Sequence, residues 1–204
     1  KSFMKVLSLL TFNLEVLRIN CVSSQGPVER FSMKVFVIFV TIALMLVIHA
    51  AFVIFRHKGA FRQQLHSLVA AVGSLFTVFY ISVTSTVLEP LQCQKHPNSD
   101  WTIRSYQGIV CWDTDEHKTM LIIGSIAFFL VPVAYLAGVV LIVRQFPRRM
   151  KAGDAQFLKS FSFLFFRFRP AQNAFVLVQV LRSFFIALVL VIPDAVSQIF
   201  ALEV

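Results

Sequence analysis

Four ionisable side chains cluster within five residues of the chain, namely Asp113, Asp115, Glu116 and His117. Carboxylates are the ligands that hard cations prefer, and acidic side chains at a pore mouth attract cations. Acids are also favoured at a helix N-terminus, where they complement the helix dipole. The pattern therefore predicts either a cation-attracting vestibule formed by the three acids or a solvated helix start.

Two of the three cysteines, Cys93 and Cys111, lie in the polar connection that also contains this acidic cluster. If that connection lies on the outer side of the membrane, it is in an oxidising compartment. A disulfide between Cys93 and Cys111 is then the pairing that we expect. Two free thiols, or pairing of one of them with Cys21, remain alternatives. His96 and His117 lie nearby, but the sequence has no tight Cys-x-x-Cys spacing, so we expect no metal site.

One further residue, Arg182, stands close to the centre of an apolar stretch. A charge near the middle of a bilayer is costly unless it faces other helices or a watery cavity. A structural pairing and a role in a pathway are both open. Arg182 stands alone, whereas voltage sensors repeat arginine at every third position, and the other apolar stretches contain no acid to pair with it.

No catalytic chemistry is visible in the sequence. It has no glycine-rich phosphate loop, no nucleophile elbow and no His-Glu-x-x-His motif, so we expect neither an enzyme nor a cofactor. The formal net charge is +9, but the basic residues sit beside hydrophobic stretches rather than on one polar face, which disfavours nucleic acid as a partner.

The elements that would position these residues are hydrophobic helices. The chain is 57% hydrophobic and 14% charged, against about 25% charged in a soluble domain. Four stretches are long and apolar enough to cross a bilayer, which takes about 20 helical residues. The expected fold is therefore all-α, an integral membrane bundle with additional interfacial helices and with spans at 33–55, 68–88, 119–143 and 173–192. Pro132 should kink the third span.

Charge predicts the orientation of these spans, because Lys and Arg stay on the cytoplasmic side. The segment 144–172 holds seven Lys or Arg and one acid, whereas Glu89–His117 holds two Lys or Arg and five acids. We therefore expect 144–172 inside, the loop 89–118 outside, and 1–32 as an outer interfacial segment. The stretch 193–204 would begin a further helix.

The inner segment combines aromatic and basic side chains. Phe157, Phe161, Phe165 and Phe168 would share one helical face, as in an amphipathic helix lying on the inner leaflet. The segment is either a plain juxtamembrane anchor or a contact for anionic lipid. The residues expected to make that lipid contact are Arg148, Arg149, Lys151, Lys159, Arg167 and Arg169.

Several phrases together resemble the transmembrane region of TRP-like membrane proteins of eukaryotic microbes, a group that includes polycystin-like and fungal TRP-like proteins. They are Lys5–Leu10 with Phe12–Leu14, Leu88–Leu91, His96–Asn98, Cys111-Trp112, Phe168–Pro170, Leu181-Arg182 and Ile192–Asp194. The resemblance implies a cation-channel-like helical bundle, in which Cys93 and Cys111 match a pair of outer-loop cysteines. It departs from that family in showing no recognisable pore filter.

The function expected from these observations is a contribution to a cation pathway, by a piece of a larger multi-pass protein of the plasma membrane or an endomembrane. The alternatives are a non-conducting structural or accessory subunit of a larger membrane complex and a membrane anchor for an extracellular Cys-rich module. The expected partners are membrane lipids and other transmembrane helices of the same or neighbouring chains.

Overall fold

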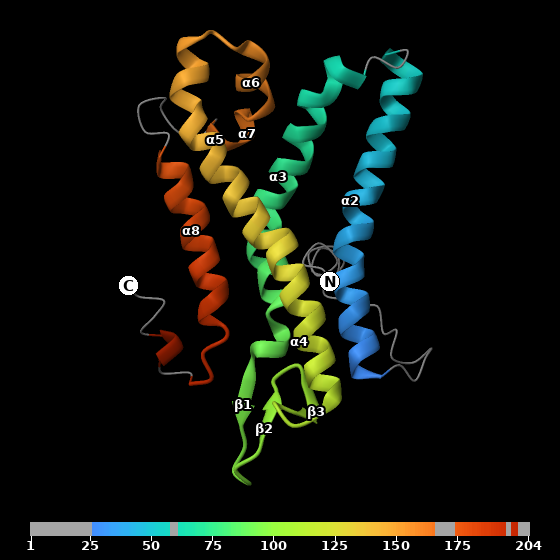
Figure 1. The fold of residues 1–204 in the computed structure, drawn as a ribbon, viewed down its shortest axis with the longest axis vertical. Coiled ribbons are helices and arrows are strands. Elements are labelled where there is room, and N and C mark those ends of the chain that lie inside the picture. Colours follow the sequence, from blue (N-terminus) through green and yellow to red (C-terminus); the bar gives the residue numbers. More distant parts are fainter. Residues whose placement is uncertain (1–25, 58–60, 166–173, 195–196, 200–204) are drawn as a thin grey trace, which may run out of the picture. The chain divides into compact units, whose positions relative to one another are not determined.

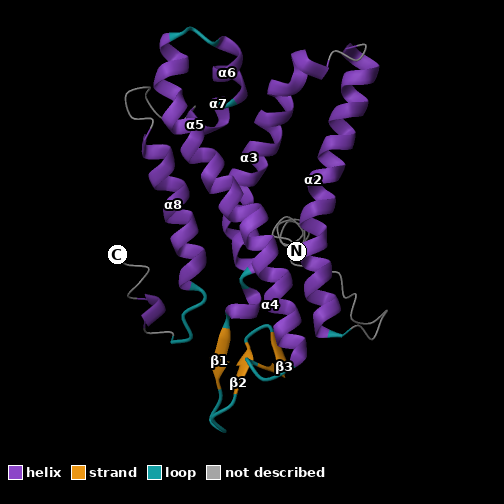
Figure 2. Cartoon of the chain, viewed as in Figure 1, coloured by secondary structure: helices purple, strands orange, loops and turns teal. Residues whose placement is uncertain are grey.

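The structure, a computed structural model, describes residues 26–57, 61–165, 174–194 and 197–199. Helices dominate, and a small sheet interrupts them between the second and third long helix (Figure 2). The chain divides into two compact units, each built from parts of the same long helices. Unit 1 comprises Lys1–Ile38, Ile81–Pro132 and Phe184–Val204, and unit 2 comprises Phe39–Tyr80 and Val133–Ser183.

The order of elements follows the chain from helix to sheet to helix (Figure 1). The two first long helices are α2 (Pro27–His57) and α3 (Phe61–Val87), and a 3₁₀ turn, η3 (Glu89–Leu91), follows them. The strands are β1 (Cys93–Lys95), β2 (Trp101–Ile103) and β3 (Tyr106–Val110). The remaining elements are α4 (Asp115–Phe128), the π-helical turn η4 (Phe129–Val133), α5 (Ala134–Lys151), α6 (Ala155–Ser160), α7 (Ser162–Phe165) and α8 (Ala174–Val189).

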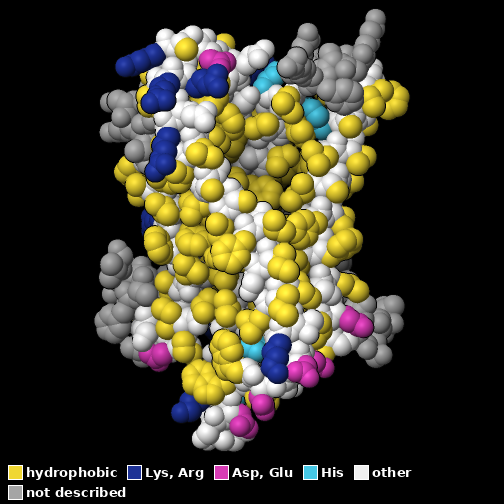
Figure 3. All heavy atoms as spheres, viewed as in Figure 1, with side chains coloured by type: hydrophobic (Ala, Val, Ile, Leu, Met, Phe, Trp, Pro, Cys, Tyr) yellow, Lys and Arg dark blue, Asp and Glu magenta, His cyan; other side chains and the backbone are white. Residues whose placement is uncertain are grey.

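Within the described residues, three helical segments are long and apolar enough to cross a membrane, namely Pro27–Phe55, Gln64–Val87 and Asp115–Lys151. They coincide with the first three stretches expected from the sequence. The fourth stretch contains α8, which is apolar but has only 16 described residues. Hydrophobic side chains cover much of the molecular face that Figure 3 shows.

The first and third long helices exceed the expected spans at both ends, and α3 exceeds its span at the N-terminal end only. α2 begins at Pro27, where proline suits the first helical position, and Glu29 accepts a hydrogen bond from the backbone N–H of Gly26 at 3.3 Å. The third helix continues to Lys151, past the expected end at Val143. Arg, Gln, Met and Lys are good helix formers, so a helix can continue after its apolar stretch ends.

In unit 1 the three strands form an antiparallel sheet in the order β1-β2-β3. Cys93 pairs with Ile103 and Lys95 with Trp101, and the β2–β3 pairing is irregular between Thr102 and Ile103. The core of the unit contains Phe31, Ile103, Ile109 and Met120, all at most 1% exposed. The expectation of an all-α fold is therefore correct only in part, because the connection between α3 and α4 contains a three-stranded sheet.

Unit 2 is a set of helices packed through large side chains. Val53, Tyr80 and Val139 are buried within it. Gly73 of α3 lies against the ring of Phe163, and a Cβ at this position would clash with that ring. The helix α3 therefore carries glycine where the segment after α6 packs directly onto its backbone.

Candidate functional site

The polar features of unit 1 converge at the sheet, which we call the cap and define as residues 89–117. Cys93 at the start of β1 and Cys111 just after β3 are joined by a disulfide. Both sulfur-bearing residues are buried, at 8% and 5% exposure. The disulfide thus closes the connection between α3 and α4 into a covalent loop.

His117 is the fully buried polar centre of the cap. Its Nδ1 accepts the backbone N–H of Trp112 at 3.0 Å, so this nitrogen carries no proton. Its Nε2 lies 3.0 Å from the carbonyl oxygen of Pro90, to which it donates. The imidazole therefore bridges η3 and the start of α4 in the Nε2–H tautomer.

Trp112 makes the tight turn that allows this bridge. Its φ is +73°, a left-handed conformation that bulky residues seldom adopt. Its indole packs edge-on against the His117 ring, with centroids 5.1 Å apart. Strained backbone of this kind persists where the surroundings fix it, and here the disulfide and the imidazole do so.

Cys93, Cys111 and His117 also place three atoms of metal-ligand type within 4.8 Å of one another. Zinc requires cysteine thiolates, and a disulfide sulfur is not a thiolate. In the oxidised form that the structure shows, the cluster is a structural core. The expectation that the chain uses no metal is not tested by this arrangement.

The acidic cluster lies on the surface at the start of α4. Asp113, Asp115 and Glu116 are all exposed, and Lys118 contacts the Asp115 carboxylate at 3.0 Å. Thr114 caps the helix by accepting the N–H of His117. The local geometry is that of a capped, acidic helix start, and the surface acids also leave the vestibule interpretation open (Figure 3).

Arg182 is exposed on α8. Among the described residues the structure gives its guanidinium no ion pair and no hydrogen bond. The apolar stretches contain no acid that could pair with Arg182, and no acid among the described residues forms an ion pair with it.

Pro132 lies inside η4, where the helix widens into one π turn. Proline lacks the N–H that an α-helix needs, and π turns absorb such a defect and are frequent at functional sites. The kink expected at Pro132 therefore coincides with a local change of helix type. Pro132 itself is buried.

The basic segment is not the single amphipathic helix that the sequence suggested. It breaks at Phe161 into α6 and α7, and Phe165 packs on Phe146 of α5 with centroids 4.0 Å apart. Phe157, Phe161 and Phe165 are thus half-buried, and the break at Phe161 prevents them from sharing one face of a continuous helix. Arg148, Arg149, Lys151 and Lys159 are exposed, whereas Phe168, Arg167 and Arg169 lie outside the described residues.

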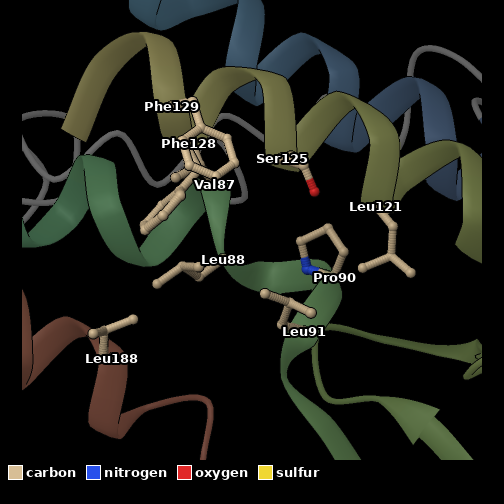
Figure 4. Close-up of a pocket in the computed structure, with 10 residues that line it drawn as sticks. Val87, Leu88, Pro90, Leu91, Leu121, Ser125, Phe128, Phe129 and Leu188 are labelled. Atoms are coloured by element: carbon tan, nitrogen blue, oxygen red, sulfur yellow. The ribbon is translucent and has the colours of Figure 1, made fainter. Parts of the chain in front are cut away.

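An apolar groove of about 270 Å³ lies in unit 1 beneath the cap, between η3, α4 and α8 (Figure 4). The Ser125 hydroxyl points into it toward Pro90, and Leu188 faces Leu88 across it. Gly124 lines the groove too, and a Cβ there would come within 2.8 Å of the Val87 carbonyl oxygen. This glycine lets α4 approach the end of α3 closely.

One largely buried ion pair was not predicted from the sequence. Lys34 of α2 contacts both carboxylate oxygens of Glu89 in η3, at 2.9 and 3.0 Å. Its ammonium also lies 5.3 Å from the centroid of the Tyr106 ring. A lysine within an apolar stretch indicates that a partner is needed. The sequence does not identify that partner, because it lies 55 positions away.

No family model, no curated protein and no solved structure matches this chain.

Proposed function

We propose that this chain is the membrane domain of a TRP-like multi-pass protein, with four spans, the cap outside and the end of α5 in the cytosol. The observation that carries the proposal is the disulfide-closed cap between α3 and α4. Disulfides form in oxidising compartments, and the cap is also the acid-rich connection. Redox chemistry and charge distribution therefore support the same orientation independently.

The proposed role is a contribution to a cation pathway. Asp113 and Glu116 on the outer cap are exposed, so their charge reaches solvent. Surface acids at an entrance raise the local cation concentration, an effect that salt screens. The π turn at Pro132 supports the same role, because it provides a site in the third span where the helix deviates from α geometry.

A second candidate is a non-conducting accessory subunit of a larger membrane complex. The exposed Arg182 favours it, because an intramembrane charge without a partner in the described residues fits a helix interface with another chain. Large exposed apolar side chains on α2, among them Phe36, Val47 and Phe55, are compatible with such an interface.

The orientation is tested by glycosylation. Asp100→Thr converts Asn98-Ser99-Asp100 in the cap into an acceptor sequence with a single change. Expressed in eukaryotic membranes, this variant should gain a glycan that an endoglycosidase removes. The matched inner variant, Gln156→Asn with Leu158→Thr, should stay unmodified. A glycan on the inner variant alone would reverse the proposed orientation.

The conduction proposal is tested by recording from the full-length protein in a bilayer free of other proteins. We expect cation current that falls at low ionic strength when Asp113→Asn and Glu116→Gln are combined. The matched control neutralises the inner Asp154 and should leave the current unchanged. Absence of current together with stoichiometric co-purifying membrane proteins would establish the accessory role instead.

A further inference from the structure

Unit 2 contains a second apolar groove, of about 310 Å³, formed by α2, α3, α5 and the segment after α6. Its wall includes Ile42, Leu68, Gly138, Ile142 and Phe161. Figure 3 shows a hollow with hydrophobic walls on the visible face. The volume is at the lower end of the range of about 300–1,000 Å³ for small-molecule sites, so it suits one hydrocarbon chain better than a bulky ring system.

Among the described residues that line the groove, Tyr135 has the only polar side chain, and its hydroxyl is already hydrogen-bonded. Its hydroxyl lies 2.6 Å from the Thr77 hydroxyl, which in turn donates to the carbonyl oxygen of Gly73. Because Thr77 has one proton and gives it to Gly73, Tyr135 donates to Thr77. The described part of the groove wall is therefore hydrocarbon, and the hydroxyl proton of Tyr135 is already used in a hydrogen bond.

Two exposed cationic side chains, Arg149 and Lys159, belong to α5 and α6, and residues of α5 and of the segment after α6 line this groove. Arg149 follows the groove residue Ile142 by seven positions on α5 and so projects from the same helical face. Lys159 precedes the groove residue Phe161 by two positions. Arg149 contacts Asp154 at 3.1 Å, but both side chains are substantially exposed, at 53% and 30%, so a phosphate can compete for the guanidinium.

The other basic residues of α5 are directed elsewhere. Arg144, Arg148 and Lys151 follow an i, i+4, i+7 spacing that forms a stripe on the opposite face of the helix. The face of α5 away from the groove thus carries three cations, whereas Arg149 is the cation on the face that lines the groove. This difference allows a site-specific effect to be separated from general attraction to an anionic membrane.

We propose that unit 2 holds one anionic phospholipid of the cytoplasmic leaflet, with an acyl chain in the groove and its phosphate at Arg149 and Lys159. The inference rests on the proposed membrane orientation and deepens it by naming a resident lipid. Lipid tails are as apolar as the groove wall, so the groove selects by fit, and the two cations supply the preference for negative charge.

The test uses the full chain in detergent micelles, titrated with dioleoyl phosphatidylserine and with dioleoyl phosphatidylcholine, and reads bound lipid by native mass spectrometry. Phosphatidylserine should bind at least tenfold more tightly. Arg149→Gln with Lys159→Gln should remove that preference, because each juxtamembrane cation contributes about a fivefold effect. Arg144→Gln with Arg148→Gln, which removes equal charge from the opposite face, should change binding less than threefold.

The acyl chain is tested separately through Gly138, where an added Cβ meets nothing within 4 Å. Gly138→Leu should fill the groove and weaken both dioleoyl lipids at least fivefold, while Gly138→Ala should not. Equal losses from the two charge variants, or unchanged binding in a folded Gly138→Leu protein, would overturn the site. The charge comparison decides even if the leucine variant fails to fold. Glycosylation of the cap is independent of all these outcomes, so a failure of the lipid site and a failure of the orientation are distinguishable.

Discussion

Lys34 of α2 and Glu89 of η3 form a two-oxygen ion pair that is largely shielded from solvent, with the side chains 14% and 15% exposed. The pair connects the first long helix to the cap within unit 1. Because the surroundings exclude most water, removing one partner would leave the other charge poorly solvated and would destabilise the fold.

Replacing one partner of this pair should therefore destabilise the protein. We expect Lys34→Met to cost about 3 kcal/mol, the low end of the range for buried pairs, because Glu89 stays behind without its ammonium. The measurement is thermal unfolding in detergent. Lys34→Met combined with Glu89→Leu should recover most of the loss.

The matched control for Lys34 is the exposed pair Lys118–Asp115, whose side chains are 59% and 97% exposed. Lys118→Ala should cost less than about 1 kcal/mol. Equal effects of the Lys34 and Lys118 variants would show that the Lys34–Glu89 contact is solvated in the folded protein.

Removing the disulfide should open the cap. Cys93→Ser or Cys111→Ser frees a loop that spans 18 positions, which the chain-entropy model values at about 3 kcal/mol. Unfolding temperature under oxidising conditions measures the loss, and alkylation followed by intact mass measures the bond. Cys21→Ser is the control, and its protein should still contain one disulfide. A lost disulfide in that variant would assign the bond to Cys21.

Substituting His117 should destabilise the cap without touching the disulfide. His117→Phe keeps a planar ring but leaves the N–H of Trp112 and the carbonyl of Pro90 without their partner. Each stranded backbone group costs about 1–3 kcal/mol. We expect increased amide hydrogen exchange at Trp112 relative to the native chain. Unchanged exchange there would mean that water replaces the imidazole.

The close approach at Gly124 should be intolerant of a methyl group. In Gly124→Ala the new Cβ would meet the Val87 carbonyl oxygen at 2.8 Å and the Pro90 ring at 3.3 Å, so α4 must shift at a cost of about 1–3 kcal/mol. Gly138→Ala is the matched control, because it is also helical but meets nothing within 4 Å. That change should be neutral or stabilising by up to about 1 kcal/mol. Thermal unfolding of the two variants side by side checks both expectations.

Hydrophobic patterning was sufficient to predict where the long helices lie, because a continuous apolar stretch is a strong signal. It could not predict that α5 continues to Lys151, since charge marks where an apolar stretch ends and not where a helix ends. The sheet was missed because its strands have only three to five residues and an alternation too short to recognise.

The candidate site was predictable only where its chemistry is local. For the two cysteines and for Pro132, the residue type alone predicts the local structure. Partners that meet through folding, such as Lys34 with Glu89 or Phe163 with Gly73, leave no mark at either position. The single amphipathic helix expected through Phe168 was wrong for the described part, because ring packing on α3 and α5 outweighed helical periodicity.

The register of the cap determines whether its disulfide can form. Cys93 stands opposite Ile103, and the N–H of Cys111 is bonded to the carbonyl oxygen of Trp101, so β2 holds both cysteines in place. A slip of one residue would turn the Cys93 side chain to the other face of the sheet. The disulfide can therefore join Cys93 to Cys111 only when β1 is correctly aligned with β2.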